Sequence, residues 1–159
     1  NNAYTTADFT AYYVNAPVDA LEQVMALESD RFMDYAFSDA QAETELNVIS
    51  EERRLRVDSN PASLLSEQMG AVSYLMHPYR IPIIGWANDI AGLTPTDIRH
   101  FLERNYQPSN MVLMIAGDVE PKDVRRLAMR YWGAMKNTRN VKRHWPSEPD
   151  PIAARSVHY

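Results

Sequence analysis

Apolar residues recur at helical spacing along most of the chain. In residues 18–34, Leu21, Val24, Met25 and Leu27 form an apolar stripe with polar residues opposite. A period of three to four residues is typical of amphipathic α-helices that bury one face. The same pattern predicts helices over residues 17–34, 40–57, 62–76, 94–106 and 121–136.

Two other stretches have strand-like composition. Residues 4–14 are rich in threonine and aromatics, which predicts one strand, or two short ones meeting near Asp8. Residues 110–116 form a continuous apolar run that predicts a buried strand. Residues 77–92 carry prolines and glycines and predict an ordered connection without regular structure. Strands near both ends with helices between them predict an α+β fold with too few strands for a complete sheet.

The composition of the chain excludes several classes of protein and of functional site. The 159 residues include 45% apolar and 23% charged residues, as in ordinary soluble domains. The net charge of -5 argues against a nucleic-acid partner. No run approaches the roughly 18 apolar residues of a membrane span. The absence of cysteine excludes disulfides, thiolate metal sites and cysteine nucleophiles.

Common catalytic motifs are absent from the sequence. The four histidines, His77, His100, His144 and His158, are scattered, and no pair has the spacing that places two imidazoles on one helix face. The sequence contains no G-x-S-x-G element and no glycine-rich phosphate loop. The histidines alone therefore predict no metal site.

Two acids in the predicted helix 40–57 share a face. Glu45 and Glu52 are seven residues apart, so they point the same way, about 10 Å apart along the axis. They border the apolar stripe of Leu46 and Ile49, where a carboxylate costs desolvation unless it pairs with an arginine or a cation. Two interpretations stay open: surface pairs with arginine, which spacing alone favours, and a carboxylate ligand of a metal site.

Five segments follow one another along the chain: NAYTT, ESDRF, ETELNVISEERRLRVDSNP, HPYRIPIIGW and YQPSNMVLMIAGDV. In this order they resemble the pitrilysin/insulinase family of zinc metallopeptidases, and most closely its bacterial zinc protease branch. The similarity extends over about residues 2–140. It implies the two-layer α/β half-domain of such a peptidase, an α+β arrangement.

The resemblance implies roles for the two glutamates. In this family an inverted motif, H-x-x-E-H, supplies two histidine ligands and a general base, and a third ligand, a glutamate, lies roughly 75 residues further on. That ligand follows another important glutamate by seven positions. Carried over, Glu52 is a zinc ligand and Glu45 a supporting residue. Glu51 does not fit, because seven positions before it lies Thr44.

The segment NAYT resembles the substrate-binding edge strand of the same family. In that family an extended peptide adds to the edge and is held by main-chain hydrogen bonds. The resemblance therefore implies that Asn2 and Ala3 bind a peptide substrate.

The sequence itself contains no H-x-x-E-H, which by the family spacing would fall roughly 25–30 residues before Asn1. We therefore expect residues 1–142 to be an N-terminal peptidase half-domain without its zinc-binding helix and first strand, which leaves the sheet incomplete. We expect residues 143–159 to begin a linker to a second, homologous half-domain or subunit. Exposed strand edges would also favour homo-oligomers. The bacterial relatives favour a periplasmic or exported location over a cytoplasmic one.

The function implied for the intact parent is a zinc-dependent metalloendopeptidase that cleaves peptides or unfolded protein segments, with one zinc per site. The chain alone is predicted to be inactive, since one carboxylate does not hold zinc. The main alternative is a non-catalytic partner or structural subunit with the same fold. Because Glu45 and Glu52 are both present, the catalytic interpretation is favoured. A third interpretation is an α+β interaction module unrelated to proteolysis.

Overall fold

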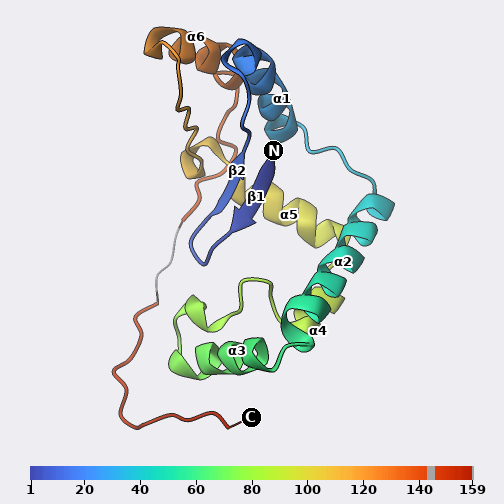
Figure 1. The fold of residues 1–159 in the computed structure, drawn as a ribbon, viewed down its shortest axis with the longest axis vertical. Helices are drawn as coiled ribbons and strands as arrows, with labels where there is room; N and C mark the ends of the chain where they lie inside the picture. Colours follow the sequence, from blue (N-terminus) through green and yellow to red (C-terminus); the bar gives the residue numbers. More distant parts are fainter. Residues whose placement is uncertain (143–145, 159) are drawn as a thin grey trace. The chain divides into compact units, whose positions relative to one another are not determined.

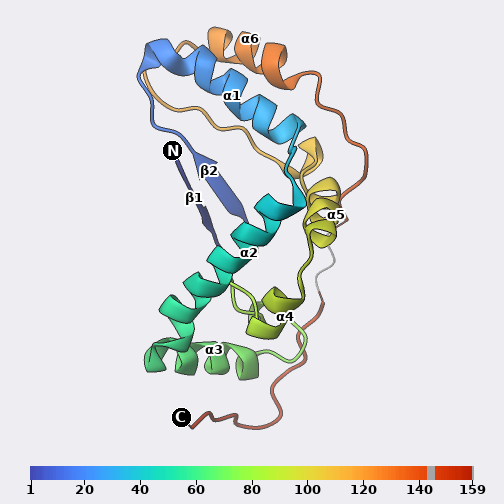
Figure 2. The ribbon, with the colours of Figure 1, turned by 90° about the vertical axis from the view of Figure 1, so that its right-hand side faces the viewer.

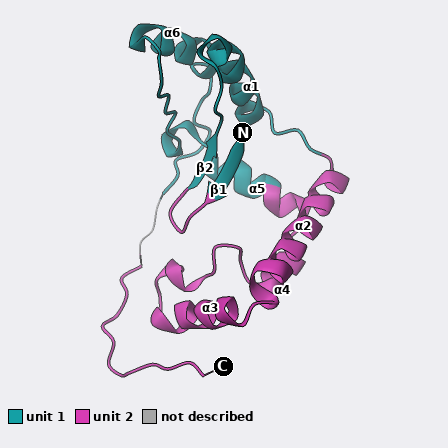
Figure 3. Cartoon of the chain, in the orientation of Figure 1, with its two compact units in different colours: residues 1–4, 10–37, 99–142 teal, residues 5–9, 38–98, 143–159 magenta. Residues whose placement is uncertain are grey.

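The computed structural model describes residues 1–142 and 146–158. Their contacts divide the chain into two units, coloured separately in Figure 3. Unit 1 contains Asn1–Tyr4, Thr10–Phe37 and Arg99–Lys142, and unit 2 contains Thr5–Phe9, Ser38–Ile98 and the C-terminal segment. The fold is α+β, as predicted, and is rich in helix with a small sheet.

The sheet has two strands in the part of the chain that the structure describes (Figure 1). Strand β1 is Asn2–Thr5 and strand β2 is Thr10–Tyr13. In the turn between them, the Thr6 N–H donates to the Phe9 carbonyl at 2.8 Å. The Thr6 hydroxyl also accepts from the Asp8 and Phe9 N–H groups at 3.2 and 3.1 Å. The prediction of two short strands meeting near Asp8 is therefore confirmed.

In unit 1, helix α1 (Leu21–Met33) packs against helix α6 (Pro121–Trp132), and both views show them side by side (Figures 1 and 2). Met25 of α1 and Leu127 of α6 are buried. At the surface, Glu22 accepts hydrogen bonds from Arg130 at 2.7 Å and from the Tyr131 hydroxyl at 2.8 Å.

Partly exposed aromatic rings also pack against one another in unit 1. Phe32 of α1 stacks on Tyr106, with 6.0 Å between centroids, and meets Tyr12 of β2 edge-on at 5.3 Å. The Arg31 guanidinium lies over the Tyr12 and Phe32 rings. Burial raises the pKa of Tyr106, and its hydrogen bond with the Tyr12 hydroxyl raises that pKa further. These contacts hold β2 against α1 within this unit.

Unit 2 is built on consecutive helical segments. Helices α2 and α3 are joined by a π-helical turn, and α4 packs against α2. Helix α5 begins in unit 2 and continues into unit 1. No helix in the described residues is long and apolar enough to cross a membrane. The bounds are α2 Asp39–Arg53, the π-helical turn Arg54–Asp58, α3 Pro61–Ser73, a 3-10 turn Pro78–Arg80, α4 Ala87–Gly92 and α5 Pro95–Asn105.

Two predictions for the elements were wrong. Residues 87–92 form helix α4 and not irregular structure, because the Pro/Gly-rich stretch ends at Gly85 and Ile90 gains burial as part of a helical turn. Residues 111–116 form no strand. Val112 and Met114 there are 87% and 83% exposed, so this apolar run is not buried. A strand needs a neighbour for its ladder hydrogen bonds, and apolar composition does not supply one.

Candidate functional site

Glu45 and Glu52 both lie on α2, whose start is set by a capping box. The Ser38 hydroxyl accepts a hydrogen bond from the Gln41 N–H at 3.2 Å, and the Gln41 side chain accepts one from the Ser38 N–H at 2.8 Å. Two backbone donors that would otherwise lack partners are thereby satisfied. The capping box fixes where the helix begins, and the two glutamates then share a face through their seven-residue spacing.

Glu52 lies where the helix widens. Helix α2 ends at Arg53, and the next turn, Arg54–Asp58, is π-helical. In this turn the Ser59 N–H donates to the Arg54 carbonyl at 3.0 Å, five residues back. π-Helical turns are rare and occur often at functional sites. The position of Glu52 beside such a turn makes it a candidate site residue on structural grounds.

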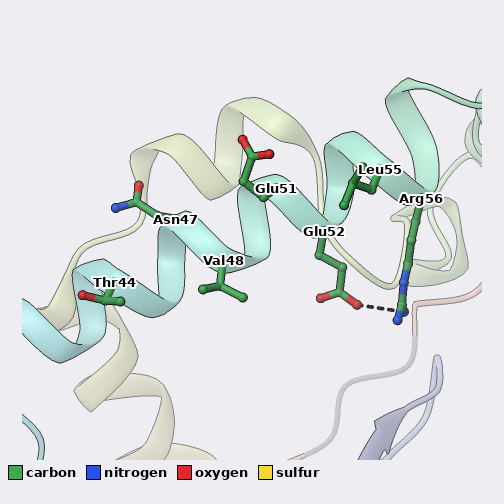
Figure 4. Close-up of a pocket in the computed structure, with 7 residues that line it drawn as sticks. All are labelled: Thr44, Asn47, Val48, Glu51, Glu52, Leu55 and Arg56. Atoms are coloured by element: carbon green, nitrogen blue, oxygen red, sulfur yellow. Dashed lines mark ion pairs between the residues drawn. The ribbon is translucent and has the colours of Figure 1, made fainter.

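The Glu52 side chain borders an open hollow along one side of this helix (Figure 4). Glu52 points to the same side as Val48, and its carboxylate pairs with Arg56 at 2.7 Å. Glu51 leaves the helix on the other side in this view and pairs with Arg54 at 2.8 Å. The Glu52 side chain is 39% exposed and that of Glu51 is 63% exposed. The lining residues are Thr44, Asn47, Val48, Glu51, Glu52, Leu55 and Arg56.

The surface-pair interpretation therefore describes the contact that Glu52 makes in this structure. An exposed ion pair between residues four apart contributes little to stability and is easily exchanged for another partner. Glu45 lies seven residues before Glu52 on the same face of α2. It is exposed and does not line the hollow.

The donor set for zinc is incomplete among residues 1–142 and 146–158, which contain no group of three or more metal-binding side chains. A glutamate oxygen is a suitable zinc ligand, but catalytic zinc sites use three protein ligands. His77 caps a 3-10 turn, its Nδ1 accepting from the Tyr79 N–H at 3.2 Å. His100 and His158 are exposed, and His144 lies outside the described residues. Glu52 fits as one member of a zinc site.

Sequence reasoning missed the role of Arg53. This residue lies on the apolar stripe of α2, is buried, and pairs with Glu67 of α3. The signal was present in the sequence, because an arginine four residues after Ile49 falls on the inward-facing stripe. A charge at such a position requires a buried partner.

Asn2 and Ala3 lie in β1, in unit 1, and both are exposed. The described sheet has only β1 and β2, so one edge of β1 has no neighbouring strand in it. The Ala3 N–H donates to the Asn2 side-chain oxygen at 2.8 Å. An exposed edge strand is the geometry that strand addition requires.

Comparison with known proteins places the chain among peptidases. The model of the insulinase family, peptidase family M16, matches residues 1–86, and the model of the peptidase M16 inactive domain matches residues 92–159. Helicobacter pylori has a relative named zinc protease PqqE, which is 28% identical over 159 residues, or 99% of this chain and 36% of that protein. Cytochrome b-c1 complex subunit 1 of Bos taurus is 27% identical over 137 residues, or 86% of this chain and 28% of that protein.

The solved structures agree with the sequence comparisons. The crystal structure of the first half of the periplasmic protease PqqL from Escherichia coli matches with a TM-score of 0.74 and 26% identity, covering 91% of this chain and 32% of that one. The chain thus spans about a third of the length of PqqE and about a third of the solved first half of PqqL. Because the insulinase model covers more than half of the residues, including β1 and both glutamates, the chain belongs to the insulinase family of peptidases, family M16.

Proposed function

We propose that the intact protein is a zinc-dependent metalloendopeptidase in which Glu52 is a metal ligand. The observation that carries this proposal is the Glu52 carboxylate at an open hollow beside a π-helical turn. Its partner there is Arg56, in a pair exposed enough for a divalent cation to displace. The kinship with a protein named zinc protease supports the same activity.

Residues of this chain would perform three tasks. Zinc, when bound, supplies a Lewis acid that polarises water and the scissile carbonyl. Glu52 would hold the metal through a carboxylate oxygen, and Glu45 would tune the charge around it from the same face of α2. Asn2 and Ala3 would bind the peptide main chain at the edge of β1. Backbone recognition of this kind tolerates many side chains, which suits peptides or unfolded segments as substrates.

Two neighbouring glutamates provide a matched test in the full-length protein. Glu52→Gln should abolish zinc retention and peptide hydrolysis, because a neutral amide is a poor zinc ligand, while the fold survives. Glu51→Gln removes an equal charge one residue away and should leave both properties close to those of the wild type. Zinc content by elemental analysis and cleavage of an unfolded protein measure the effect. Equal behaviour of the two variants would refute the role of Glu52.

The isolated chain of 159 residues should be inactive and bind zinc weakly at best, since its described residues contain no group of three metal-binding side chains. Isothermal titration calorimetry with zinc tests this directly. Tight binding of one zinc per chain would contradict it and would point to a site built from other residues.

A non-catalytic partner subunit is the second candidate. It is favoured by the likeness to a subunit of the cytochrome b-c1 complex. The two candidates differ in the zinc content of the purified full-length protein. Absence of zinc and of cleavage, with a stable complex formed with a second subunit, would favour the partner role.

The proposed enzyme works with a second, homologous half-domain or subunit that closes over the peptide, and residues 143–159 begin the connection to it. Residues 143–145 and 159 of this segment lie outside the described residues. Likeness to the periplasmic protease PqqL supports a periplasmic or exported location. Cell fractionation tests the location. Cross-linking of the full-length protein tests whether two halves or two copies associate.

A further inference from the structure

Arg53 is a buried cation that joins separate segments of unit 2. The side chains of Arg53 and Glu67 are each 6% exposed. The guanidinium binds the Glu67 carboxylate with two hydrogen bonds, at 2.7 and 3.0 Å. It also donates to the Gly85 carbonyl at 2.7 Å and lies 3.3 Å from an Asp58 oxygen. One side chain therefore connects α2 with α3, with the π-helical turn and with the loop before α4.

This buried ion pair carries a large desolvation cost, so it is a poor means of stabilising the fold. Two charges are removed from water, and the buried Arg53 Nε has no hydrogen-bond partner in the described residues. Replacement of such a pair by apolar residues of similar volume is often neutral or stabilising. Well-placed buried ion pairs can instead select one geometry among alternatives. The fork of an arginine on a carboxylate fixes both distance and angle.

The geometry fixed by Arg53 bears directly on Glu52, the preceding residue. Adjacent residues of a helix differ by about 100° in direction, so the inward direction of Arg53 determines the direction in which Glu52 leaves the helix. A carboxylate lies about 6 Å from the helix axis, and a rotation of about 20° would displace it by about 2 Å. That displacement equals a whole zinc–oxygen bond length.

We propose that Arg53 is a positioning residue that holds the last turn of α2 at one rotation and thereby aims the Glu52 carboxylate at its metal. This inference rests on the proposed function, since it needs Glu52 to be a ligand. Gly85 contributes to the same fixation. Its φ of +88° suits glycine, and its carbonyl accepts from Arg53. Arg53 is thus held by the Glu67 carboxylate on α3 and by the Gly85 carbonyl on the loop before α4.

The test uses the full-length protein and separates an effect on the direction of the Glu52 carboxylate from an effect on stability. Arg53→Met leaves Glu67 buried without a partner and should lower Tm strongly. The double variant Arg53→Met/Glu67→Leu removes both charges and should recover most of Tm. Its zinc affinity, measured by competition with a chelator well below Tm, should still be weakened roughly 10- to 100-fold. Arg54→Met, an exposed neighbour, serves as the control.

Another variant tests the positioning role in case the double variant does not fold. Arg53→Lys keeps the charge but loses the two-pronged contact, and it should fold with zinc affinity lowered about tenfold. Zinc affinity within twofold of the wild type in every folded variant would overturn the positioning role while the proposed function stands. If wild type and Glu52→Gln bound zinc with equal affinity, the proposed function would be overturned, and the positioning role with it.

Discussion

The Glu148 carboxylate accepts a hydrogen bond from the His77 backbone N–H at 2.8 Å, although the two residues are 71 positions apart. The N–H groups of Leu75 and Met76 donate to the same carboxylate at 2.6 and 2.9 Å. Three consecutive backbone donors thus converge on one anion just after α3. Within unit 2, this contact attaches the C-terminal segment to the loop that follows α3.

Arg155 makes a second attachment of the same segment. Its guanidinium donates to the carbonyls of Val72 and Ser73 at 2.7 and 3.0 Å. These carbonyls belong to the last turn of α3, where helix geometry leaves them without partners, and a cation is favourable there. The segment that was predicted to be a linker is therefore bound at two points in its described part.

Acid should release the first attachment. The backbone N–H groups of residues 75–77 lower the pKa of Glu148 below its usual value of 4.5. A lowered pKa means that the stabilising contribution is fully present above 4.5 and is lost as pH falls through the lower folded-state pKa. The amide chemical shifts of residues 75–77 should therefore titrate together in an NMR pH series, with a midpoint below 4.5. Glu148→Gln should abolish the transition, whereas Asp150→Asn, two residues on, should preserve it.

Substitution of Gly85 should destabilise unit 2. Gly85→Ala puts a side chain at a φ of +88°, which costs roughly 1–2 kcal/mol. The added methyl would meet Ile90 at 3.6 Å, an ordinary contact, so the cost comes from the backbone. Gly70→Ala on α3 meets nothing within 4 Å and should raise stability by about 0.5–1 kcal/mol. Denaturant unfolding of both variants tests the contrast, and equal effects would contradict it.

Loss of the capping box should weaken α2. Ser38→Ala removes the hydroxyl that accepts from the Gln41 N–H and should cost about 1 kcal/mol. Ser50→Ala lies inside the same helix, where the serine hydroxyl only bonds back to the Leu46 carbonyl, and it should be neutral or slightly stabilising. Thermal unfolding monitored by circular dichroism compares the two. A larger loss of thermal stability in Ser50→Ala than in Ser38→Ala would show that the cap is unimportant.

Removal of Arg56 should strengthen zinc binding by the full-length protein, if Glu52 is a ligand. Arg56→Gln frees the Glu52 carboxylate and removes a positive charge 2.7 Å from it, which should raise zinc affinity about fivefold. Arg54→Gln frees Glu51 in the same manner and should leave affinity unchanged. Chelator competition at constant ionic strength measures both. A weaker affinity in Arg56→Gln would show that Arg56 supports the site.

Apolar residues at helical spacing predicted most of the helices, and local caps fix where several of them begin. Ser38 and Gln41 mark the start of α2. The Asn60 side chain accepts from the Ala62 and Ser63 N–H groups at the start of α3. Thr94 and Asp97 form a similar reciprocal contact at the start of α5. Such caps act within a few residues, so they can be read from sequence. The extended run at 111–116 failed as a strand prediction because pairing depends on a distant segment.

The sequence by itself determined that Glu45 and Glu52 share one face of a helix, because helical geometry depends only on spacing. It also identified the peptidase family through its ordered segments. The roles of Glu45, Glu52, Asn2 and Ala3 stay predictions. Only the tertiary structure decided that Arg53 is buried against Glu67 and Gly85, which lie 14 and 32 residues away. Partners at that separation meet through packing of separate helices and loops, and no local rule of spacing specifies which of them will meet.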